Sequence, residues 1–189
     1  MRVTLFVPCF VDAVYPRAGM AIVEILERLG HEVVFAESLV CCGQPAFNSG
    51  YWDEARPFAE KAVAALRDAE TVVIASGSCG AMLKVFYPQL LAATPLEDDA
   101  RSLSARVFEF SDFLVSRLGV TDLGARFDGV ATFHDGCHGL RELGIKTQPR
   151  QLLERVAGLT LVEMDEAESC CGFGGTFSAK FPAISSAMG

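Results

Sequence analysis

Residues 41–43 read Cys-Cys-Gly, and residues 170–172 read Cys-Cys-Gly again. Each pair follows one upstream cysteine at nearly the same distance, with 31 residues after Cys9 and 32 residues after Cys137. Cys79 then follows the first pair after 36 residues. All seven cysteines therefore belong to one spacing pattern, written once in full and once in part. Packing alone gives cysteines no reason to keep such spacing, so the repeat predicts two metal–thiolate sites in two similar modules.

Strand and helix patterns alternate outward from these cysteines in the first half of the chain. Short apolar runs predict strands at 3–8, 32–35 and 71–75, and helical spacing of apolar residues predicts helices at about 18–29, 53–69 and 80–91. This alternation predicts an α/β fold with mainly parallel sheets flanked by helices on both faces. Every cysteine then follows the carboxyl end of a strand, where open α/β sheets place their ligands.

The second half repeats the plan, with predicted strands at 129–134 and 160–164 and a helix at about 151–157. A proline and three consecutive acids at 97–99 predict a linker over residues 92–105. We therefore expect a first CCG module over 1–95 and a second over 105–189, related by a pseudo-two-fold internal repeat. The strand and cysteine equivalent to 71–79 do not follow the second pair, so this module is expected to be truncated and the natural protein to continue.

Composition excludes several classes of protein. Half of the 189 residues are hydrophobic (51%) and only 21% are charged, which excludes a disordered chain. The net charge of −8 argues against nucleic acid as a partner, since a basic face would be expected there. No apolar run is long enough to cross a bilayer, and no signal peptide precedes the first strand, so we expect a cytoplasmic protein without a transmembrane segment.

Four thiolates match the ligand count of a [4Fe–4S] cluster or of an all-thiolate zinc site. Two adjacent thiolates repel each other unless a cation lies between them, which favours metal over free thiols. Spacing does not separate the two metals; we favour an iron–sulfur cluster, with zinc as the alternative and buried or disulfide-bonded cysteines as the third interpretation. The predicted ligands are Cys9, Cys41, Cys42, Cys79, Cys137, Cys170 and Cys171.

Four further residues are expected to surround the ligands. Gly43 can adopt the positive φ that a turn through two adjacent cysteines requires, and Gly172 stands in the same position of the second copy. His134 and His138 bracket Cys137, and each is expected to orient the site through a hydrogen bond rather than to bind metal. No catalytic acid, base or hydride acceptor is identified.

The segments Cys41-Cys42-Gly43-Gln44-Pro45, His134-Asp135-Gly136-Cys137-His138 and Cys170-Cys171-Gly172-Phe173-Gly174-Gly175 resemble the cysteine-rich CCG-domain family. This family contains iron–sulfur oxidoreductase subunits of heterodisulfide reductases, glycolate oxidases and lactate utilisation systems, and the resemblance to the last group covers the whole chain. It implies an electron-transfer subunit of a cytoplasmic complex that oxidises L-lactate, or a related 2-hydroxy acid such as glycolate, to the 2-oxo acid. The other subunits of that complex would be its partners.

Two other functions remain open from the sequence. One is a thiol–disulfide reductase subunit of the heterodisulfide type, in which a substrate reaches the cluster directly. The other is an interaction module that zinc stabilises and that has no redox role. Iron with a reducible signal supports electron transfer or disulfide reduction, whereas zinc without iron supports the interaction module.

Overall fold

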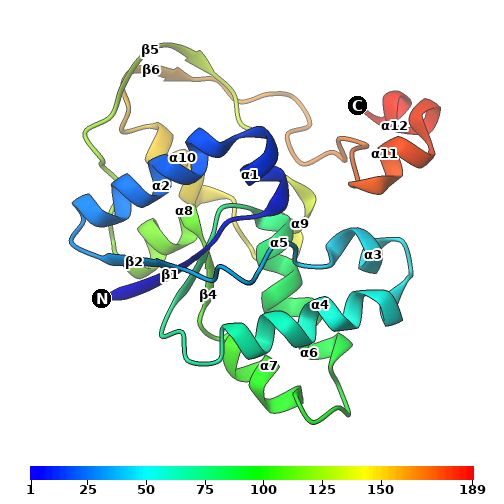
Figure 1. Cartoon of the computed structure of the whole chain (residues 1–189). Helices are drawn as coiled ribbons and strands as arrows, with labels where there is room; N and C mark the ends of the chain where they lie inside the picture. The colour runs from blue at the N-terminus through cyan, green and yellow to red at the C-terminus, as the bar shows by residue number, and fades with distance from the viewer.

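The computed structural model describes all 189 residues and confirms the α/β class (Figure 1). A four-stranded parallel sheet in the order β2-β1-β3-β4 forms its centre. These strands are β1 (Arg2–Phe6), β2 (Glu32–Phe35), β3 (Val72–Ile74) and β4 (Val107–Glu109). Because β1 pairs with β2 on one side and with β3 on the other, the crossover helices cover both faces of the sheet.

Helices connect the strands of this sheet and follow its last strand. They are α1 (Cys9–Val14), α2 (Pro16–Arg28), α3 (Gln44–Asn48), α4 (Trp52–Ala65), α5 (Gly77–Ala81), the π-helical η1 (Met82–Phe86), α6 (Tyr87–Leu90), α7 (Glu97–Ser104), α8 (Phe110–Asp112) and the π-helical η2 (Phe113–Arg117). No helix of the molecule combines the length and the apolar character that crossing a membrane requires.

Strand β3 shows how the sequence builds two cores, one on each face of the sheet. Its three residues are all fully buried, and successive side chains of a strand point to opposite faces. Val72 and Ile74 pack in the larger cluster with α4, η1, α6 and α7, whereas Val73 packs with residues of α2 and η2. Burial of each such side chain stabilises the fold by about 2 kcal/mol, which makes this sheet the rigid base of the molecule.

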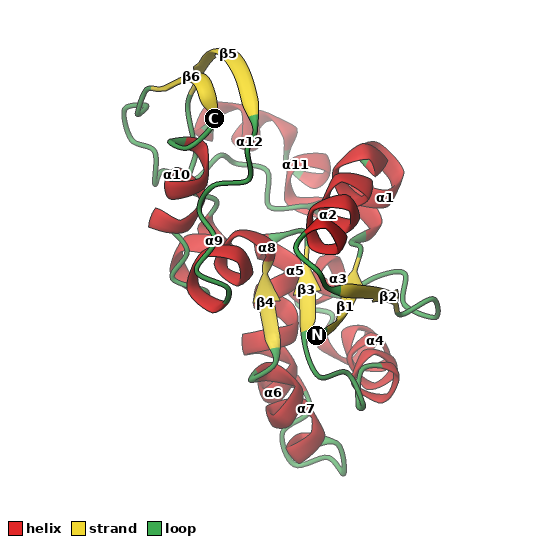
Figure 2. Cartoon of the chain, turned by 90° about the vertical axis from the view of Figure 1, so that its left-hand side faces the viewer, coloured by secondary structure: helices red, strands yellow, loops and turns green.

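The second sheet is a separate parallel pair, β5 (Arg126–Ala131) and β6 (Ala157–Leu161), at the top of Figure 1. None of its residues is buried, and Phe127 and Val130 are 61% and 71% exposed. The remaining helices are α9 (Cys137–Arg141), α10 (Thr147–Leu153), α11 (Thr176–Lys180) and α12 (Pro182–Met188). Figure 2 shows α11 and α12 apart from the four-stranded sheet.

Several predicted boundaries are wrong. Residues 97–104, expected in a linker, form helix α7, because the three acids occupy its first turn, where carboxylates are favourable. Strand β4 follows and adds to the first sheet, which the sequence did not predict. The strands expected at 129–134 and 160–164 begin and end three residues earlier, and the helix expected at 151–157 is α10. The division into modules 1–95 and 105–189 stays a prediction.

The two halves meet through short helices that carry cysteines. Helix α5 of the first half packs against α9 of the second, and a Cβ at Gly77 would lie 3.1 Å from the Cα of Gly139. Glycine is therefore required for the backbones to approach this closely. A hydrogen bond of 2.8 Å between the hydroxyls of Ser49 and Thr176 joins the halves a second time. These contacts place the cysteines of both halves on the same side of the four-stranded sheet.

Candidate metal–thiolate site

The first four cysteines lie beyond the carboxyl ends of β1, β2 and β3, as predicted. Cys9 is the first residue of α1, Cys41 and Cys42 lie in the loop before α3, and Cys79 lies in α5. Cys9 is exposed and Cys41 is partly buried, whereas Cys42 and Cys79 are buried in the larger core cluster. The set therefore runs from the core to the surface.

Contacts between thiols connect these four cysteines in sequence order. The sulfurs of Cys42 and Cys79 are 3.1 Å apart, well beyond a disulfide bond length. The thiol of Cys41 neighbours both Cys42 and Cys9 closely enough to alter their pKa values. The backbone N–H of Gly43 donates a hydrogen bond of 3.4 Å to the Cys41 sulfur. Segments far apart in the chain therefore bring four sulfurs into one neighbourhood.

The raised pKa values of these thiols indicate that several negative charges together are unfavourable in this neighbourhood. The hydrogen bond with Cys42 and then burial raise the pKa of Cys41 far above its ordinary value. For Cys42 the hydrogen bond with Cys41 lowers the pKa, but Cys79 and burial outweigh it and leave the pKa far above normal. Burial and the neighbouring Cys41 raise the pKa of Cys9. Thiols that cannot all ionise in each other's presence are the groups that a bound cation would convert to thiolates.

The backbone of the Cys41-Cys42 turn is held by two features. Gly43 has a φ of +79°, as its position predicts, and caps the start of α3. Its left-handed conformation allows two adjacent cysteines to face one neighbourhood. The buried hydroxyl of Tyr87 donates a hydrogen bond of 3.0 Å to the carbonyl of Cys42. Burial and the three nearby thiols raise the pKa of Tyr87, so this phenol remains a donor.

The four thiols suit a metal centre, either a single ion or a cluster. Four thiolates around one zinc ion at ~2.3 Å must lie within ~4 Å of one another. No three His, Cys, Asp or Glu side chains of the molecule converge in a way that would hold one metal ion. In a four-iron cluster each iron takes one cysteine, so the four thiols equal the ligand number of either centre, and the 3.1 Å between the Cys42 and Cys79 sulfurs does not select one.

The three cysteines of the second half are held differently. Cys137 is the partly exposed first residue of α9, and Cys170 and Cys171 are exposed in the loop between β6 and α11. Gly172 follows with a φ of +71° and packs under the Ser185 carbonyl of α12. No core cluster includes any of these three thiols.

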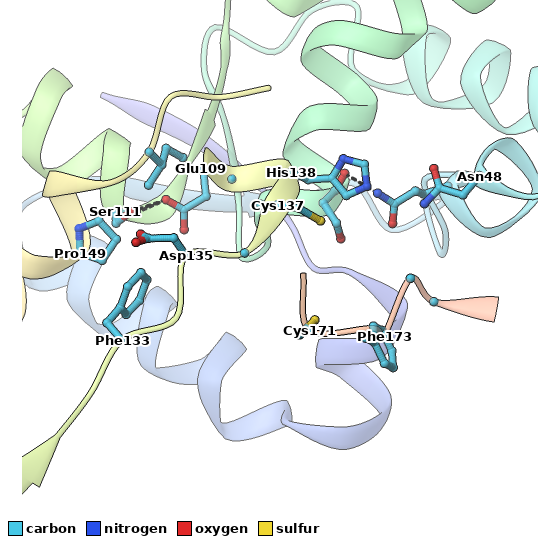
Figure 3. Close-up of a pocket in the computed structure, with 18 residues that line it drawn as sticks. Asn48, Glu109, Ser111, Phe133, Asp135, Cys137, His138, Pro149, Cys171 and Phe173 are labelled. Atoms are coloured by element: carbon cyan, nitrogen blue, oxygen red, sulfur yellow. Dashed lines mark hydrogen bonds between the residues drawn. The ribbon is translucent and has the colours of Figure 1, made fainter. Parts of the chain in front are cut away.

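A cavity of about 310 Å³ lies between the halves, and Cys137 and Cys171 border it from different segments (Figure 3). The four-stranded sheet and the segments that follow its strands contribute Gln44, Asn48, Gly77, Ser78, Glu109 and Ser111 to its wall. Two carboxylates and one imidazole line the cavity, but no lysine or arginine does. The cavity therefore does not offer the cationic anchor that a small carboxylate needs.

The two predicted histidines have different surroundings. The Nε2 atom of exposed His134 lies 2.8 Å from the carbonyl oxygen of Ser169, the residue before Cys170, so this ring joins two cysteine loops. His138 lines the cavity with its ring edge-on to Phe86, and its Nδ1 lies 3.2 Å from a carboxylate oxygen of Glu142. Neither atom of that pair has a partner with hydrogen-bond geometry.

Two ionisable residues of the site were missed from the sequence. Glu109 ends β4 in the cavity wall; burial raises its pKa although it accepts hydrogen bonds from Ser111 and Asp112. Arg150 of α10 forms a bidentate pair with Asp135, two residues before Cys137. Neither lies in the cysteine pattern, and only a prediction of β4 could have placed Glu109 at a strand end.

Comparison with known proteins places these features in a family. The model of the CCG cysteine-rich domain matches residues 3–84 and 131–189, so it covers both halves and all seven cysteines. Lactate utilization protein A of Geobacillus kaustophilus (strain HTA426) is 50% identical over 189 residues, which are 100% of this chain and 79% of that protein. Lactate utilization protein A of Bacillus subtilis (strain 168) is 46% identical over the same coverage.

Proposed function

Since the chain belongs to the CCG cysteine-rich domain family together with lactate utilization protein A, we propose that it is an iron–sulfur electron-transfer subunit of a lactate-oxidising complex. In this proposal L-lactate, or a related 2-hydroxy acid such as glycolate, is oxidised to the 2-oxo acid. The observation that carries the proposal is the row of four thiols at the carboxyl ends of three parallel strands.

In the first site Cys9, Cys41, Cys42 and Cys79 would hold a [4Fe–4S] cluster. Such a cluster accepts and releases one electron at a time. The core holds Cys42 and Cys79 in place, and the Gly43 N–H directs a hydrogen bond to the Cys41 sulfur, which stabilises negative charge there. Exposed Cys9 brings the site to the surface, where a partner subunit could exchange electrons with it.

In the second site Cys137, Cys170 and Cys171 would be ligands, with His134, His138 and Gly172 around them. The loops that carry these thiols are joined to each other by His134 and by the ion pairs of Arg150. Both sites border the same side of the molecule, so the proposed partners are other subunits of the complex that dock over this side. A cytoplasmic location belongs to the same proposal.

Oxidation of the hydroxy acid itself is assigned to another subunit. A 2-hydroxy acid is an anion at neutral pH, and its recognition calls for arginine, lysine or a metal. The cavity between the halves has Glu109 and Asp135 in its wall and no lysine or arginine. This charge pattern supports electron transfer rather than catalysis on the acid.

The test is metal analysis and EPR of the anaerobically purified chain. We expect iron and sulfide with a reducible signal, and lactate-dependent reduction only when the other subunits of the complex are present. Cys42→Ser should remove most of the iron of the first site, because the buried sulfur lies between two other thiols. His31→Gln, outside all cysteine contacts, is the control and should keep the iron. Zinc without iron, or unchanged iron in Cys42→Ser, would contradict the proposal.

A further inference from the structure

Arg150 uses every N–H group of its guanidinium. Nη1 and Nη2 donate to the two carboxylate oxygens of Asp135, each at 2.8 Å. Nε and Nη2 donate to the two oxygens of Glu163 at 2.6 and 2.9 Å, and Nη1 also donates to the Lys146 carbonyl at 2.7 Å. Arginine has five such hydrogens, so none is left for water.

The acceptors of Arg150 belong to the two loops that carry the second set of cysteines. Asp135 follows β5 and lies two residues before Cys137, whereas Glu163 begins the loop from β6 to Cys170 and Cys171. Arg150 itself is on α10, between the two strands in sequence. One side chain therefore fixes three segments relative to each other.

Backbone contacts extend this link to the cysteines themselves. The N–H of Asp135 donates to the Ala167 carbonyl at 2.8 Å, and the His134 ring meets the Ser169 carbonyl at 2.8 Å. Ser169 precedes Cys170 directly. A movement of Asp135 would therefore shift Cys137 along its own loop and the Cys170-Cys171 pair across the hydrogen bonds.

Burial makes the Arg150–Asp135 pair difficult to replace by water. The side chains are 14% and 1% exposed, and the Arg150 guanidinium also lies 5.3 Å from the centre of the Phe133 ring. By contrast, Arg126 and Asp128 of β5 form a similar pair at 2.7 Å, but both side chains are 69% exposed. A buried bidentate ion pair holds its two side chains in one geometry, whereas water can replace the partners of an exposed ion pair.

We propose that Arg150 is a positioning residue that sets the separation of the Cys137 thiol from the Cys170 and Cys171 thiols. The inference rests on the proposed function only in assigning these thiols to a second metal site. The geometric claim concerns the polypeptide and is testable without metal. Lysine cannot replace arginine here, because one ammonium cannot hold two carboxylates in a planar fork.

The test measures how fast iodoacetamide alkylates Cys137 and Cys171 in the full chain after chelation of metal, with rates read from peptide masses. Arg150→Lys is expected to raise the rate at partly buried Cys137 about tenfold, because loops that lose the Arg150 ion pairs open more often, whereas exposed Cys171 should react at a similar rate in all variants. Glu163→Gln removes only the ion pair between Arg150 and the β6 loop and is expected to raise the rate at Cys137 about threefold. The matched control Arg126→Lys should change neither rate by more than about twofold.

A Cys137 rate within twofold of that of the unmodified chain in Arg150→Lys would overturn the proposal. Glu163 is half exposed, so its variant will fold even if Arg150→Lys does not, and an unchanged Cys137 rate there would also overturn the proposal. EPR of the iron-reconstituted variants gives an independent readout: a change in the signal of the second site alone is expected. Failure of the electron-transfer proposal would instead appear as absent iron, with the alkylation differences intact.

Discussion

The two parallel sheets hold their cysteines by different means. The four-stranded sheet buries its central strand completely and anchors Cys42 and Cys79 in the apolar core. The β5–β6 pair has no buried residue, and its neighbouring thiols depend on the ion pairs of Arg150 and on hydrogen bonds between loops. The same cysteine pattern can thus be supported by hydrophobic packing in one place and by charged groups in another.

The largest expected effect tests the hydrophobic packing of the four-stranded sheet. Ile74→Ala, in the fully buried β3, should lower the free energy of unfolding by about 3–4 kcal/mol, since it removes core methyl groups and leaves a cavity. Val130→Ala, 71% exposed in β5, is the control and should cost less than about 0.5 kcal/mol. Urea denaturation measures both. Equal losses would show that β5 is as well packed as β3.

The next largest effect tests the ion pairs that support the cysteines near the β5–β6 sheet. Asp135→Asn should cost about 2 kcal/mol at neutral pH, because it leaves Arg150 with one carboxylate partner, whereas exposed Asp128→Asn should cost little. The hydrogen bonds from Arg150 lower the pKa of Asp135 below its ordinary value of 3.8. The contribution is therefore constant above about pH 5 and is lost as the pH falls through the lowered pKa. Urea denaturation of both variants between pH 3 and 8 measures these losses. A difference in stability between Asp135→Asn and Asp128→Asn that grew at acid pH would contradict the prediction.

A smaller effect compares one hydrogen bond in each region. Tyr87→Phe should cost about 1 kcal/mol, because the buried Cys42 carbonyl loses its donor. His134→Phe removes the exposed contact to the Ser169 carbonyl, where water can take over, and should cost a few tenths of a kcal/mol. Thermal denaturation of the two variants ranks them. A larger loss for His134→Phe would reverse the comparison.

The smallest effect concerns Glu109, which lies where the two regions meet. Burial raises its pKa, so the folded state binds its proton more tightly and ionisation at higher pH costs stability. Glu109→Gln should therefore slightly raise the free energy of unfolding at pH 8 and leave it unchanged well below pH 4.5, where the side chain is protonated in both the folded and the unfolded state. Urea denaturation at pH 8 and pH 4 checks the sign. A loss at pH 8 would mean that the ionised carboxylate is stabilised.

The sequence predicted the first sheet better than the second for a physical reason. β2 begins and ends where expected, and β1 and β3 differ from the prediction by one or two residues, because each consists mostly of β-branched and aromatic residues, whereas the short β4 was not predicted. The strands β5 and β6 begin at polar or small residues such as Arg126 and Ala157, so the apolar signal appeared three residues late.

Within the site the sequence identified the thiols but not the groups that hold them. The cysteine spacing predicted that Cys9, Cys41, Cys42 and Cys79 would share a neighbourhood, and the structure brings them together. Arg150 was missed, because its partners come from two loops that only the fold brings close. The spacing of residues along the chain reveals contacts within one helix or strand. A salt bridge between two loops has no regular spacing in the sequence, so the sequence alone does not reveal it.

The contact between Gly77 and Gly139 determines how closely the helices of the two cysteine sets approach each other. Helix α5 carries Cys79 and α9 begins at Cys137, and no side chain separates the two backbones at this contact. A side chain at position 77 would have to push α9 away, because its Cβ would lie 3.1 Å from the Gly139 Cα. The distance between the two cysteine sets is therefore set by the absence of a single side chain, at a position outside the repeated cysteine pattern.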